Sequence, residues 1–408
     1  MKPTGPIPPY FEARDGELAI GGLTASALVK KAGDTPLFVY SKDAIVARMG
    51  ELREALPEKV RIHYAMKANP YGPLLEMMAD LVDGLDIASG GELAQARNAG
   101  YLPREISFAG PGKRDDELLT AIRAGVIINL ESENEARRAL DIGRTLDVAP
   151  RLAIRVNPEF ELRGSGMKMG GGAKPFGVDA DRVPALAREL VESGANWRGF
   201  HIYSGSQSLD AEAIVESQAN VIALSSQLAK DAGVDVPHLN MGGGFGIPYF
   251  DKDSRLDLTI IGDGLAEQLV NLPSNLAETD FALELGRYLV GEAGVYLTRI
   301  VDRKVSHGTT YLITDGGLHH QLAASGNFGT VVRRNYPIAV ANRWDEDAAE
   351  TVNVVGCLCT PLDRLGDQVL LPMAEIGDLI AVFCAGAYGA SASPAEFLGQ
   401  GPALERLV

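Results

Sequence analysis

The sequence is poor in cysteine, in long hydrophobic runs and in positive charge. Its three cysteines are an odd, small number, which argues against a disulfide framework and for a reducing compartment. No stretch approaches about 18 consecutive apolar residues, so we expect no membrane span. With 38 basic and 54 acidic residues the net charge is −16, which opposes binding to nucleic acid or to an anionic membrane. The amino terminus lacks the apolar segment of a signal peptide, and we expect a soluble, cytoplasmic protein.

Residues at the spacing of metal ligands are also missing. Cys357 and Cys359 are too close together for a standard zinc pair, and no matching pair of Cys or His follows at ligand spacing. His319 and His320 are adjacent, a spacing that does not place two ligands on one helix face. We therefore expect no structural metal.

The chain of 408 residues is long enough for two domains. From residue 60 onward, short apolar runs alternate with amphipathic helical patterns. The runs are 60–66, 84–88, 105–109, 126–130, 151–156, 198–204, 236–241 and 281–284. Eight strands alternating with helices predict a (β/α)8 TIM-like barrel, with a doubly wound open sheet as the alternative. We prefer the barrel because polar or glycine-rich residues follow every run, and active sites form at the carboxyl ends of barrel strands.

The pattern changes after residue 287. Strand-like runs are separated by Gly and Pro turns, and long helical patterns are scarce. The runs are 295–305, 311–314, 351–356, 368–371 and 378–383. They predict an all-β carboxyl-terminal domain, a barrel or a sandwich. We place the α/β barrel at residues 37–285, and the β-rich domain at 286–408 together with 1–36.

Lys67 directly follows the first barrel run, and Asn69 and Pro70 then open a loop. A lysine held among apolar neighbours at a strand end is a candidate amine nucleophile, because partial desolvation favours the neutral amine. The simpler interpretation is a surface lysine at a strand terminus.

Other strand ends carry groups that fit the same chemistry. The glycine-rich run 242–246 can offer backbone N–H groups to a phosphate, although such runs also occur in flexible turns. Arg287 could add a charged donor to that phosphate. Glu284 could pair with a protonated ring nitrogen, or only with Arg287. His201 could stack on an aromatic ring, or be a structural residue. An amine, a phosphate cradle, a stacking ring and a carboxylate are together the requirements of pyridoxal 5′-phosphate chemistry.

Motifs along nearly the whole chain, from about residue 37 to 397, resemble those of the fold-type III, alanine-racemase-like pyridoxal-phosphate enzymes. Within that group they are most similar to the decarboxylases of diaminopimelate, ornithine and arginine type. The motifs are YAMKAN at 64–69, DIASGGE at 86–92, HIYSGSQ at 201–207, GGGFG at 242–246, ELGR at 284–287, CTPLD at 359–363 and GAYG at 386–389.

The resemblance implies a role for each matching residue. Lys67 would form a Schiff base with the cofactor, His201 would stack on its ring and Glu284 would pair with the ring nitrogen. The residues around its phosphate would be Ser204, Gly243, Gly244, Gly286, Arg287 and Tyr388, with Asp86 close by. Cys359 would return a proton after carbon dioxide leaves, and Asp363 would contact the distal end of the substrate.

In this family both Cys359 and Asp363 enter the active site of the other subunit, so the resemblance implies a homodimer. Arg287 and Tyr388 would face substrate as well as phosphate. Cys359 could instead be a small buried hydrophobe, the interpretation that we keep for Cys357 and Cys384.

Several residues depart from the diaminopimelate pattern. Leu285 replaces the usual Pro, the loop 160–171 lacks the usual His-Thr-His, residues 323–325 replace an Arg-Pro pair, and Asp363 stands where a Glu is usually nearby. These departures resemble a specialised subgroup from antibiotic and exopolysaccharide gene clusters, of which one relative acts on an aminoacyl group tethered to a carrier protein. Arg333 and Arg334 read as a solvated pair, but could bind a carboxylate or a phosphopantetheine phosphate.

The sequence therefore predicts decarboxylation of an L-amino acid, free or linked to an acyl carrier protein, without naming it. Two alternatives stay open. A racemase on the same scaffold needs acid and base groups on opposite faces of the cofactor, and Cys359 with Asp363 argues against it. A non-catalytic regulator would lose the cofactor residues, yet Lys67, His201 and Glu284 are all present.

Overall fold

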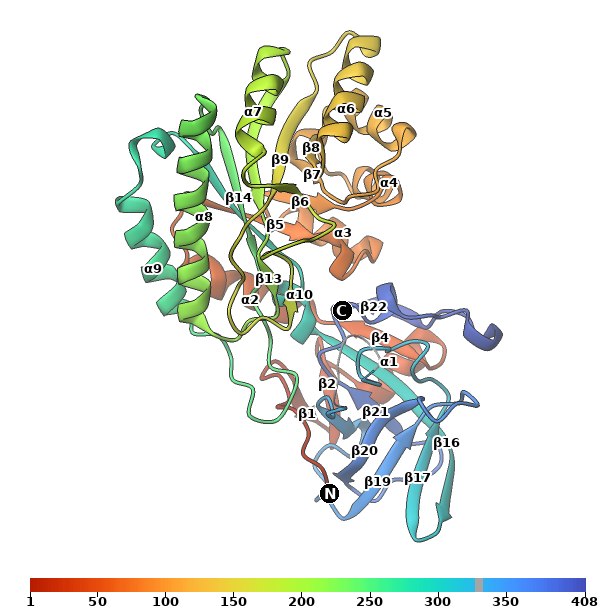
Figure 1. Cartoon of the computed structure of the whole chain (residues 1–408). Coiled ribbons are helices and arrows are strands. Elements are labelled where there is room, and N and C mark those ends of the chain that lie inside the picture. The colour runs from red at the N-terminus through yellow and green to blue at the C-terminus, as the bar shows by residue number, and fades with distance from the viewer. Residues whose placement is uncertain (327–332) are drawn as a thin grey trace. The chain divides into compact units, whose positions relative to one another are not determined.

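The computed structural model of the chain describes residues 1–326 and 333–408. They form two compact units (Figure 1). The barrel unit contains residues 49–246 and 256–285, and the β-rich unit contains 1–48, 247–255 and 286–408. This grouping differs from the limits expected from sequence at two places, because residues 37–48 and 247–255 make their contacts within the β-rich unit.

Eight parallel strands form the barrel. They are β5 (Val60–Ala65), β6 (Gly84–Ile87), β7 (Ile106–Phe108), β8 (Ile127–Leu130), β9 (Arg151–Asn157), β12 (Asn196–Ile202), β14 (His238–Gly243) and β15 (Asp280–Leu285). The sheet order runs from β9 through β12, β14, β15, β5, β6 and β7 to β8, and β8 pairs with β9. The sheet thus closes on itself, which confirms the predicted barrel and excludes the open sheet. Most residues of these strands are buried, as expected for parallel strands that are covered on both faces.

Helices connect these strands. They are α3 (Gly72–Ala79), α4 (Gly90–Asn98), α5 (Asp115–Ala124), α6 (Glu133–Leu146), α7 (Val183–Glu192), α8 (Ala211–Ala232) and α9 (Leu258–Val270), while α2 (Lys42–Ala55) contains residues of both units. The side chains of Ser89, Ser132, Asp210 and Asp257 accept N–H groups at the first turns of α4, α6, α8 and α9, which fixes where these helices begin. The minor elements of this unit are η1 (Met66–Ala68), η2 (Pro103–Glu105), η3 (Ser274–Leu276), β10 (Met167–Lys168), β11 (Val178–Asp179) and β13 (Gly205–Ser206).

The β-rich unit is built on one long strand, β16 (Gly294–Ser306). Its sheet runs in the order β18, β21, β16, β17, β19 and β20, and β4 pairs with both β16 and β22. The bounds are β4 (Leu37–Tyr40), β17 (Thr309–Thr314), β18 (Ile338–Val340), β19 (Glu350–Val355), β20 (Arg364–Leu371), β21 (Leu379–Val382) and β22 (Leu404–Leu407). These strands confirm the mostly-β character predicted for the carboxyl-terminal residues.

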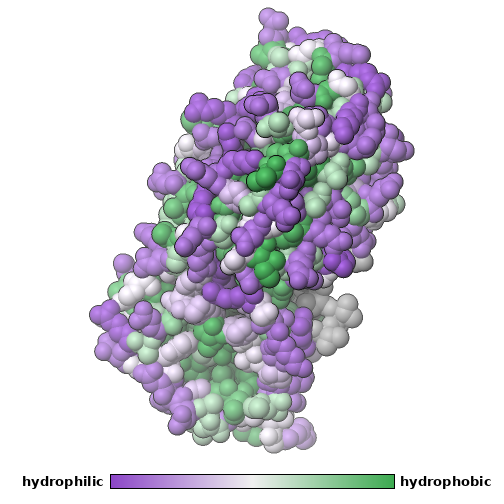
Figure 2. All heavy atoms as spheres, turned by 90° about the vertical axis from the view of Figure 1, so that its left-hand side faces the viewer, coloured by the Kyte–Doolittle hydropathy of each residue, from purple (hydrophilic) through white to green (hydrophobic). Residues whose placement is uncertain are grey.

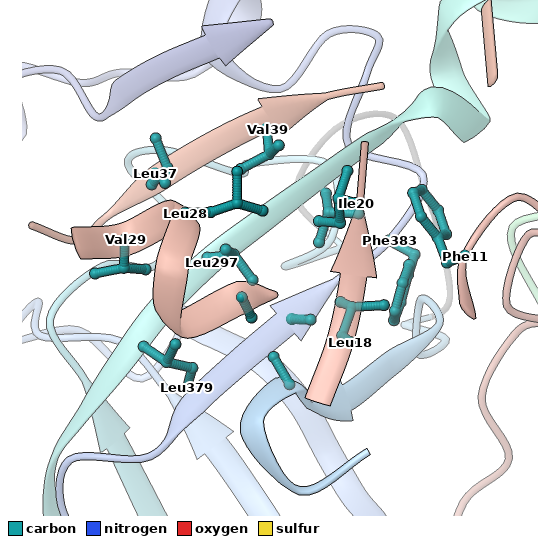
Figure 3. Close-up of a cluster of buried hydrophobic side chains, with 14 residues drawn as sticks. Phe11, Leu18, Ile20, Leu28, Val29, Leu37, Val39, Leu297, Leu379 and Phe383 are labelled. Atoms are coloured by element: carbon teal, nitrogen blue, oxygen red, sulfur yellow. The ribbon is translucent and has the colours of Figure 1, made fainter. Parts of the chain in front are cut away.

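The amino-terminal residues supply part of the core of the β-rich unit. A small sheet of β1 (Glu12–Arg14), β2 (Glu17–Ile20) and β3 (Leu23–Thr24) leads into α1 (Ala25–Ala32), which Thr24 caps. Leu18 and Leu28 pack in one buried cluster with Leu297 and Phe383 (Figure 3). The short helices of this unit are α10 (Arg287–Val290), η4 (Gly291–Ala293), η5 (Ala341–Arg343), η6 (Ala390–Ala392) and η7 (Phe397–Gly399).

On the face shown in Figure 2, hydrophilic side chains separate small groups of hydrophobic ones. No helix among the described residues combines the length and the apolar content that crossing a membrane requires.

Candidate active site

Lys67 lies at the carboxyl end of β5, in the short helix η1. The strand before it is almost entirely buried, and the turn after it is held by Asn69, whose carbonyl accepts the Tyr64 hydroxyl at 2.8 Å and whose side chain accepts the N–H of Tyr71 at 3.0 Å. The Lys67 side chain is 48% exposed, so it is less desolvated than the sequence suggested. Its Nζ lies 3.3 Å from Oε1 of Glu284 and 5.6 Å from the centroid of the Tyr203 ring.

Glu284 lies in β15, the strand between β14 and β5, and is buried. Its Oε2 lies 3.0 Å from Nε2 of His201. Burial would raise the pKa of this carboxyl, but the charge of Lys67 and the hydrogen bond from His201 outweigh burial and hold the pKa well below its ordinary value. The carboxylate is therefore ionised at neutral pH, with two nitrogen partners from two other strand ends.

His201 lies at the carboxyl end of β12 with its ring buried. Nε2 faces Glu284, whereas the buried Nδ1 has no hydrogen-bond partner among residues 1–326 and 333–408. The structure thus brings together Lys67, Glu284 and His201, three residues singled out in the sequence. The contact with Lys67 also places Tyr203 beside them, a residue that the sequence did not single out.

Asp86 occupies β6, beside the strand that leads to Lys67. Its side chain is buried, and neither oxygen accepts a hydrogen bond from the described residues. Nδ1 of His63 lies 3.5 Å from Oδ2 of Asp86. An aspartate with unused acceptors fits the predicted position close to a cofactor, and that role stays a prediction.

The glycine-rich run after β14 has a structural reason as well. A Cβ on Gly243 would lie 2.0 Å from the carbonyl oxygen of Glu284, and one on Gly246 would lie 2.7 Å from that of Ser208. The N–H groups of Gly242 and Gly246 already donate to Asn240 and Ser208. Close packing of strand ends therefore requires glycine here, and fewer N–H groups are available to a phosphate than the sequence suggested.

Two further residues are predicted phosphate neighbours, Ser204 and Gly244, of which Gly244 belongs to this run. The Ser204 hydroxyl is buried and lies 2.8 Å from that of Ser217. A Cβ on Gly244, which has a φ of +88°, would lie 2.6 Å from the carbonyl oxygen of Gly205. The predicted contact of either residue with a phosphate stays a prediction.

A buried ion pair supports the same end of the barrel. Glu131 accepts Nη1 of Arg155 at 2.9 Å, and its oxygens also accept the N–H groups of Gly110 and Gly177 at 2.6 and 2.7 Å. It therefore holds the loop after β7 and the segment before β11 against β8. The charge of Arg155 also helps to lower the pKa of Glu284. Both residues stand at predicted strand ends, a signal that was present in the sequence but was not used to select them.

In the β-rich unit, Arg287 lies among tyrosines. Its Nη1 donates to the Tyr249 hydroxyl at 2.7 Å, and its guanidinium carbon lies 4.8 Å from the centroid of the Tyr388 ring. Burial alone would lower the pKa of Arg287, but Tyr249 and Tyr388 raise the pKa by more than burial lowers it. The guanidinium therefore keeps its charge. Its buried Nε has no hydrogen-bond partner in the described part of the chain. Gly286 caps the short helix that Arg287 begins, and Tyr249 is a neighbour that the sequence did not indicate.

Asp363 has a structural role. It is buried, and its two oxygens accept the N–H groups of Leu318 and Leu358 at 2.6 and 2.9 Å. Burial raises the pKa of its carboxyl. The side chain thus ties the loop that carries Cys359 to the segment at Leu318, and the predicted contact of Asp363 with substrate stays a prediction.

Cys359 itself is exposed, so the interpretation as a buried hydrophobe is wrong for this residue. The same interpretation is wrong for Cys357, which is exposed, and is confirmed for Cys384, which is buried.

Of the arginine pair that the sequence suggested to be solvated, Arg334 is exposed, whereas Arg333 is partly buried. Arg333 donates to the carbonyls of Ser325 and Arg364 at 2.8 and 2.6 Å, and burial lowers its pKa to about 10. The guanidinium carbon of Arg334 lies 3.7 Å from the centroid of the Phe250 ring. Both side chains are thus engaged within the β-rich unit, and a role for Arg333 in substrate binding stays a prediction.

Known proteins match the chain over most of its length. The sequence profile of the pyridoxal-dependent decarboxylase, pyridoxal binding domain, matches residues 42–291. A relative from Niallia circulans, named as the decarboxylase of L-glutamyl-BtrI acyl-carrier protein, is 36% identical over 389 residues, which cover 94% of this chain and 90% of that protein. The diaminopimelate decarboxylase of Aquifex aeolicus is 33% identical over 385 residues, covering 93% and 88%. The crystal structure of diaminopimelate decarboxylase from Helicobacter pylori with L-lysine gives a TM-score of 0.83 at 27% identity and covers 93% of each chain.

The chain belongs to the pyridoxal-dependent decarboxylases. It is an amino-acid decarboxylase whose cofactor is pyridoxal 5′-phosphate, and the comparisons support neither a racemase nor a non-catalytic regulator.

The residues present fit this cofactor. In the barrel unit, the buried, ionised carboxylate of Glu284 is an acceptor for a protonated ring nitrogen. In the β-rich unit, the buried Nε–H of Arg287 is unused among the described residues and suits a phosphate oxygen.

Proposed function

We propose that Lys67 attaches the cofactor covalently and that Glu284 and His201 hold its ring. The observation that carries this proposal is the 3.3 Å separation between Nζ of Lys67 and a carboxylate that its surroundings keep ionised. Bound pyridoxal phosphate supplies a ring that accepts the electron pair left when carbon dioxide departs. Glu284 would keep a proton on the ring nitrogen, and His201, fixed through Nε2, would present its flat face to the ring.

Within the β-rich unit, Arg287 and Tyr388 are our candidates for binding the phosphate. Ser204, Gly243, Gly244 and Gly286 complete the proposed set. Arg287 is a charged donor whose position Tyr249 already fixes.

The assignment of Lys67 is tested by Lys67→Ala. We expect the purified wild type to show the visible absorption band of lysine-bound cofactor, and the variant to lose both the band and the release of carbon dioxide. Lys230→Ala, which removes an exposed lysine near the end of α8, is the matched control. A Lys67→Ala protein that keeps the band would overturn the assignment.

We propose further that the substrate is a glutamyl group on an acyl-carrier protein rather than free diaminopimelate. The Niallia circulans relative, named for such a substrate, supports this. The chain's own residues support it too, because diaminopimelate has a second charged end that needs charged partners. Residues 323–325, which replace the Arg-Pro pair, carry no charge that could serve as such a partner. Ala324 is buried, and the Ser325 hydroxyl donates to the carbonyl of Leu322 at 2.6 Å.

Carbon dioxide release distinguishes these substrates. We expect turnover of L-glutamate loaded on the BtrI acyl-carrier protein and of a glutamyl-phosphopantetheine thioester, and at least about tenfold lower kcat/KM for free diaminopimelate, a difference of about 1.4 kcal/mol. Preference for free diaminopimelate would refute the carrier-linked substrate while leaving the decarboxylase assignment intact.

We also propose a cytoplasmic homodimer in which Cys359 donates the proton to a site of the partner. The exposure of Cys359 supports this, because a proton donor must be reachable. Lys67→Ala and Cys359→Ala proteins, each inactive alone, should recover about a quarter of wild-type activity when equal amounts are unfolded and reassembled together, since half of the dimers would then carry one intact site. No recovery, or a monomer in solution, would contradict the shared site.

A further inference from the structure

The barrel unit contains a cavity at the amino-terminal ends of its strands. Its volume is about 500 Å³, within the range of small-molecule sites. Five neighbouring strands, β9, β12, β14, β15 and β5, contribute charged or imidazole side chains from their first residues. They are Arg151, Arg198, His238, Asp280 and Arg61. Because Lys67, His201 and Glu284 lie at the carboxyl ends of strands, this cavity is separate from the site described above.

The charges in this cavity do not balance locally. Arg61 lies 3.3 Å from Asp280, with both side chains about half exposed. Of the other lining carboxylates, Asp83 is held by Arg53, which is not in the lining, and Glu105 lies 3.8 Å from Arg104, which is. In contrast, neither Arg151 nor Arg198 lies within ion-pair distance of a carboxylate among the described residues. Two guanidinium groups are thus left without a compensating charge, in a protein whose net charge is −16.

The hydrogen bonds of these two arginines are also incomplete. Arg151 donates through Nη1 to the carbonyl of Gly125 at 2.9 Å. The Nε of Arg198 is buried and has no hydrogen-bond partner in the described residues. A buried cationic donor without an acceptor is costly, and the cost is removed when an anion supplies the acceptor.

The positive charge in the cavity helps to lower the pKa of neighbouring basic groups. Burial lowers the pKa of Arg151, and the nearby charge of Arg198 lowers it further. Burial, with the charges of His63, Arg198 and Arg61 next in size, lowers the pKa of His238 to about 3. The His63 and His238 rings lie nearly parallel, with centroids 5.8 Å apart. His238 is therefore neutral, and its imidazole can serve as a hydrogen-bond partner rather than as a further charge.

We propose that this cavity binds an oxyanion of the phosphate class, with Arg151 and Arg198 as its charged donors. The guanidinium fork matches two oxygens of a phosphate or phosphate ester, and such charge-assisted pairs are stronger than neutral hydrogen bonds. Two guanidinium groups from adjacent strands suit a dianion better than a single carboxylate. The competing interpretation is that the cavity contains only water. The amino-terminal end of such barrels usually contributes to stability rather than to ligand binding.

Calorimetric titration with inorganic phosphate tests the proposal on protein saturated with pyridoxal phosphate, so that the cofactor's own phosphate site is filled. We expect saturable binding by the wild type, at least tenfold weaker binding by Arg198→Gln, and intermediate binding by Arg198→Lys, which keeps the charge but lacks the fork. The control Arg137→Gln removes the same charge from an exposed position on α6 and should bind as the wild type does.

Two results would overturn the anion site. One is the absence of saturable phosphate binding by the wild type, which needs no variant to fold. The other is equal affinity in wild type and Arg198→Gln, each shown by its visible cofactor band to be folded.

Discussion

Nζ of Lys67 and Oε1 of Glu284 lie 3.3 Å apart, although 217 residues separate them in the chain. Two adjacent parallel strands, β5 and β15, bring them together, since Glu284 pairs in register with His63. The same carboxylate accepts His201 on its other oxygen. Both contacts favour the ionised form of this buried carboxylate, and the proposed role of Glu284 requires that form.

Glu284→Gln should lower kcat by roughly 10²–10³-fold, the usual cost of removing one aligned electrostatic partner. The amide keeps the size of the side chain but cannot hold a proton on the ring nitrogen. Steady-state carbon dioxide release measures the effect, with Glu189→Gln on the exposed face of α7 as control. Unchanged kcat in Glu284→Gln would show that Glu284 does not act on the cofactor.

His238 should make the protein less stable as the pH falls below 6.5. Its pKa is about 3 when folded and 6.5 in the reference state, so the unfolded chain binds the extra proton. The stabilising contribution is present above pH 6.5 and is lost as the pH falls towards 3. Between pH 6 and 5, the free energy of unfolding of the wild type should fall by about 1.4 kcal/mol more per pH unit than that of His238→Gln. Urea titrations at several pH values measure the free energy of unfolding. The control His307→Asn changes a residue in an exposed turn, and its stability should depend on pH as that of the wild type does.

Glu131→Gln should destabilise the protein by about 3–5 kcal/mol, because it leaves the buried guanidinium of Arg155 without its counter-charge. The matched control is Glu133→Gln, two residues away, whose ion pair with Arg182 lies on the surface and should be worth at most about 1 kcal/mol. Denaturant unfolding compares the two. Similar losses in both variants would mean that burial of the Glu131 pair has no special importance.

Asp363→Asn separates a structural from a substrate-binding role. If Asp363 only ties backbone N–H groups of two segments, the variant should lose about 1–3 kcal/mol of stability, with little change in KM of the molecules that remain folded. A raised KM with unchanged stability would instead support contact with the substrate. Asp345→Asn, at an exposed position, is the control.

Gly243→Ala should disrupt the carboxyl end of β14, because the added Cβ would lie 2.0 Å from the carbonyl oxygen of Glu284. We expect loss of cofactor binding and of stability together. Gly50→Ala, in α2 with nothing within 4 Å of the new Cβ, should instead stabilise the protein by about 1 kcal/mol. A Gly243→Ala protein with normal cofactor binding would show that the strand ends can move apart.

The order of strands and the residues at their ends could be predicted from the sequence, because the alternation of apolar runs and helical patterns is local. This covers Lys67, His201 and Glu284, which β5, β12 and β15 bring together. The partners of each side chain could not be predicted. That Asp363 turns inward to Leu318 depends on backbone contacts between segments distant in the chain. The sequence also gave no reason to choose Tyr249 as the partner of Arg287, since nothing in a single chain without an alignment shows which tyrosine lies nearby.

The pairing of β4 with β22 affects how the protein is made. Residues 37–40 leave the ribosome long before residues 404–407, which form the strand that covers their edge. Most of the barrel unit lies between them and is nearly continuous in sequence, so it can fold while synthesis continues. Until β22 arrives, one edge of β4 stays unpaired, and an open strand edge is where chains associate wrongly. Translation that slows or stops before residues 404–407 should therefore cause aggregation through the β-rich unit rather than through the barrel.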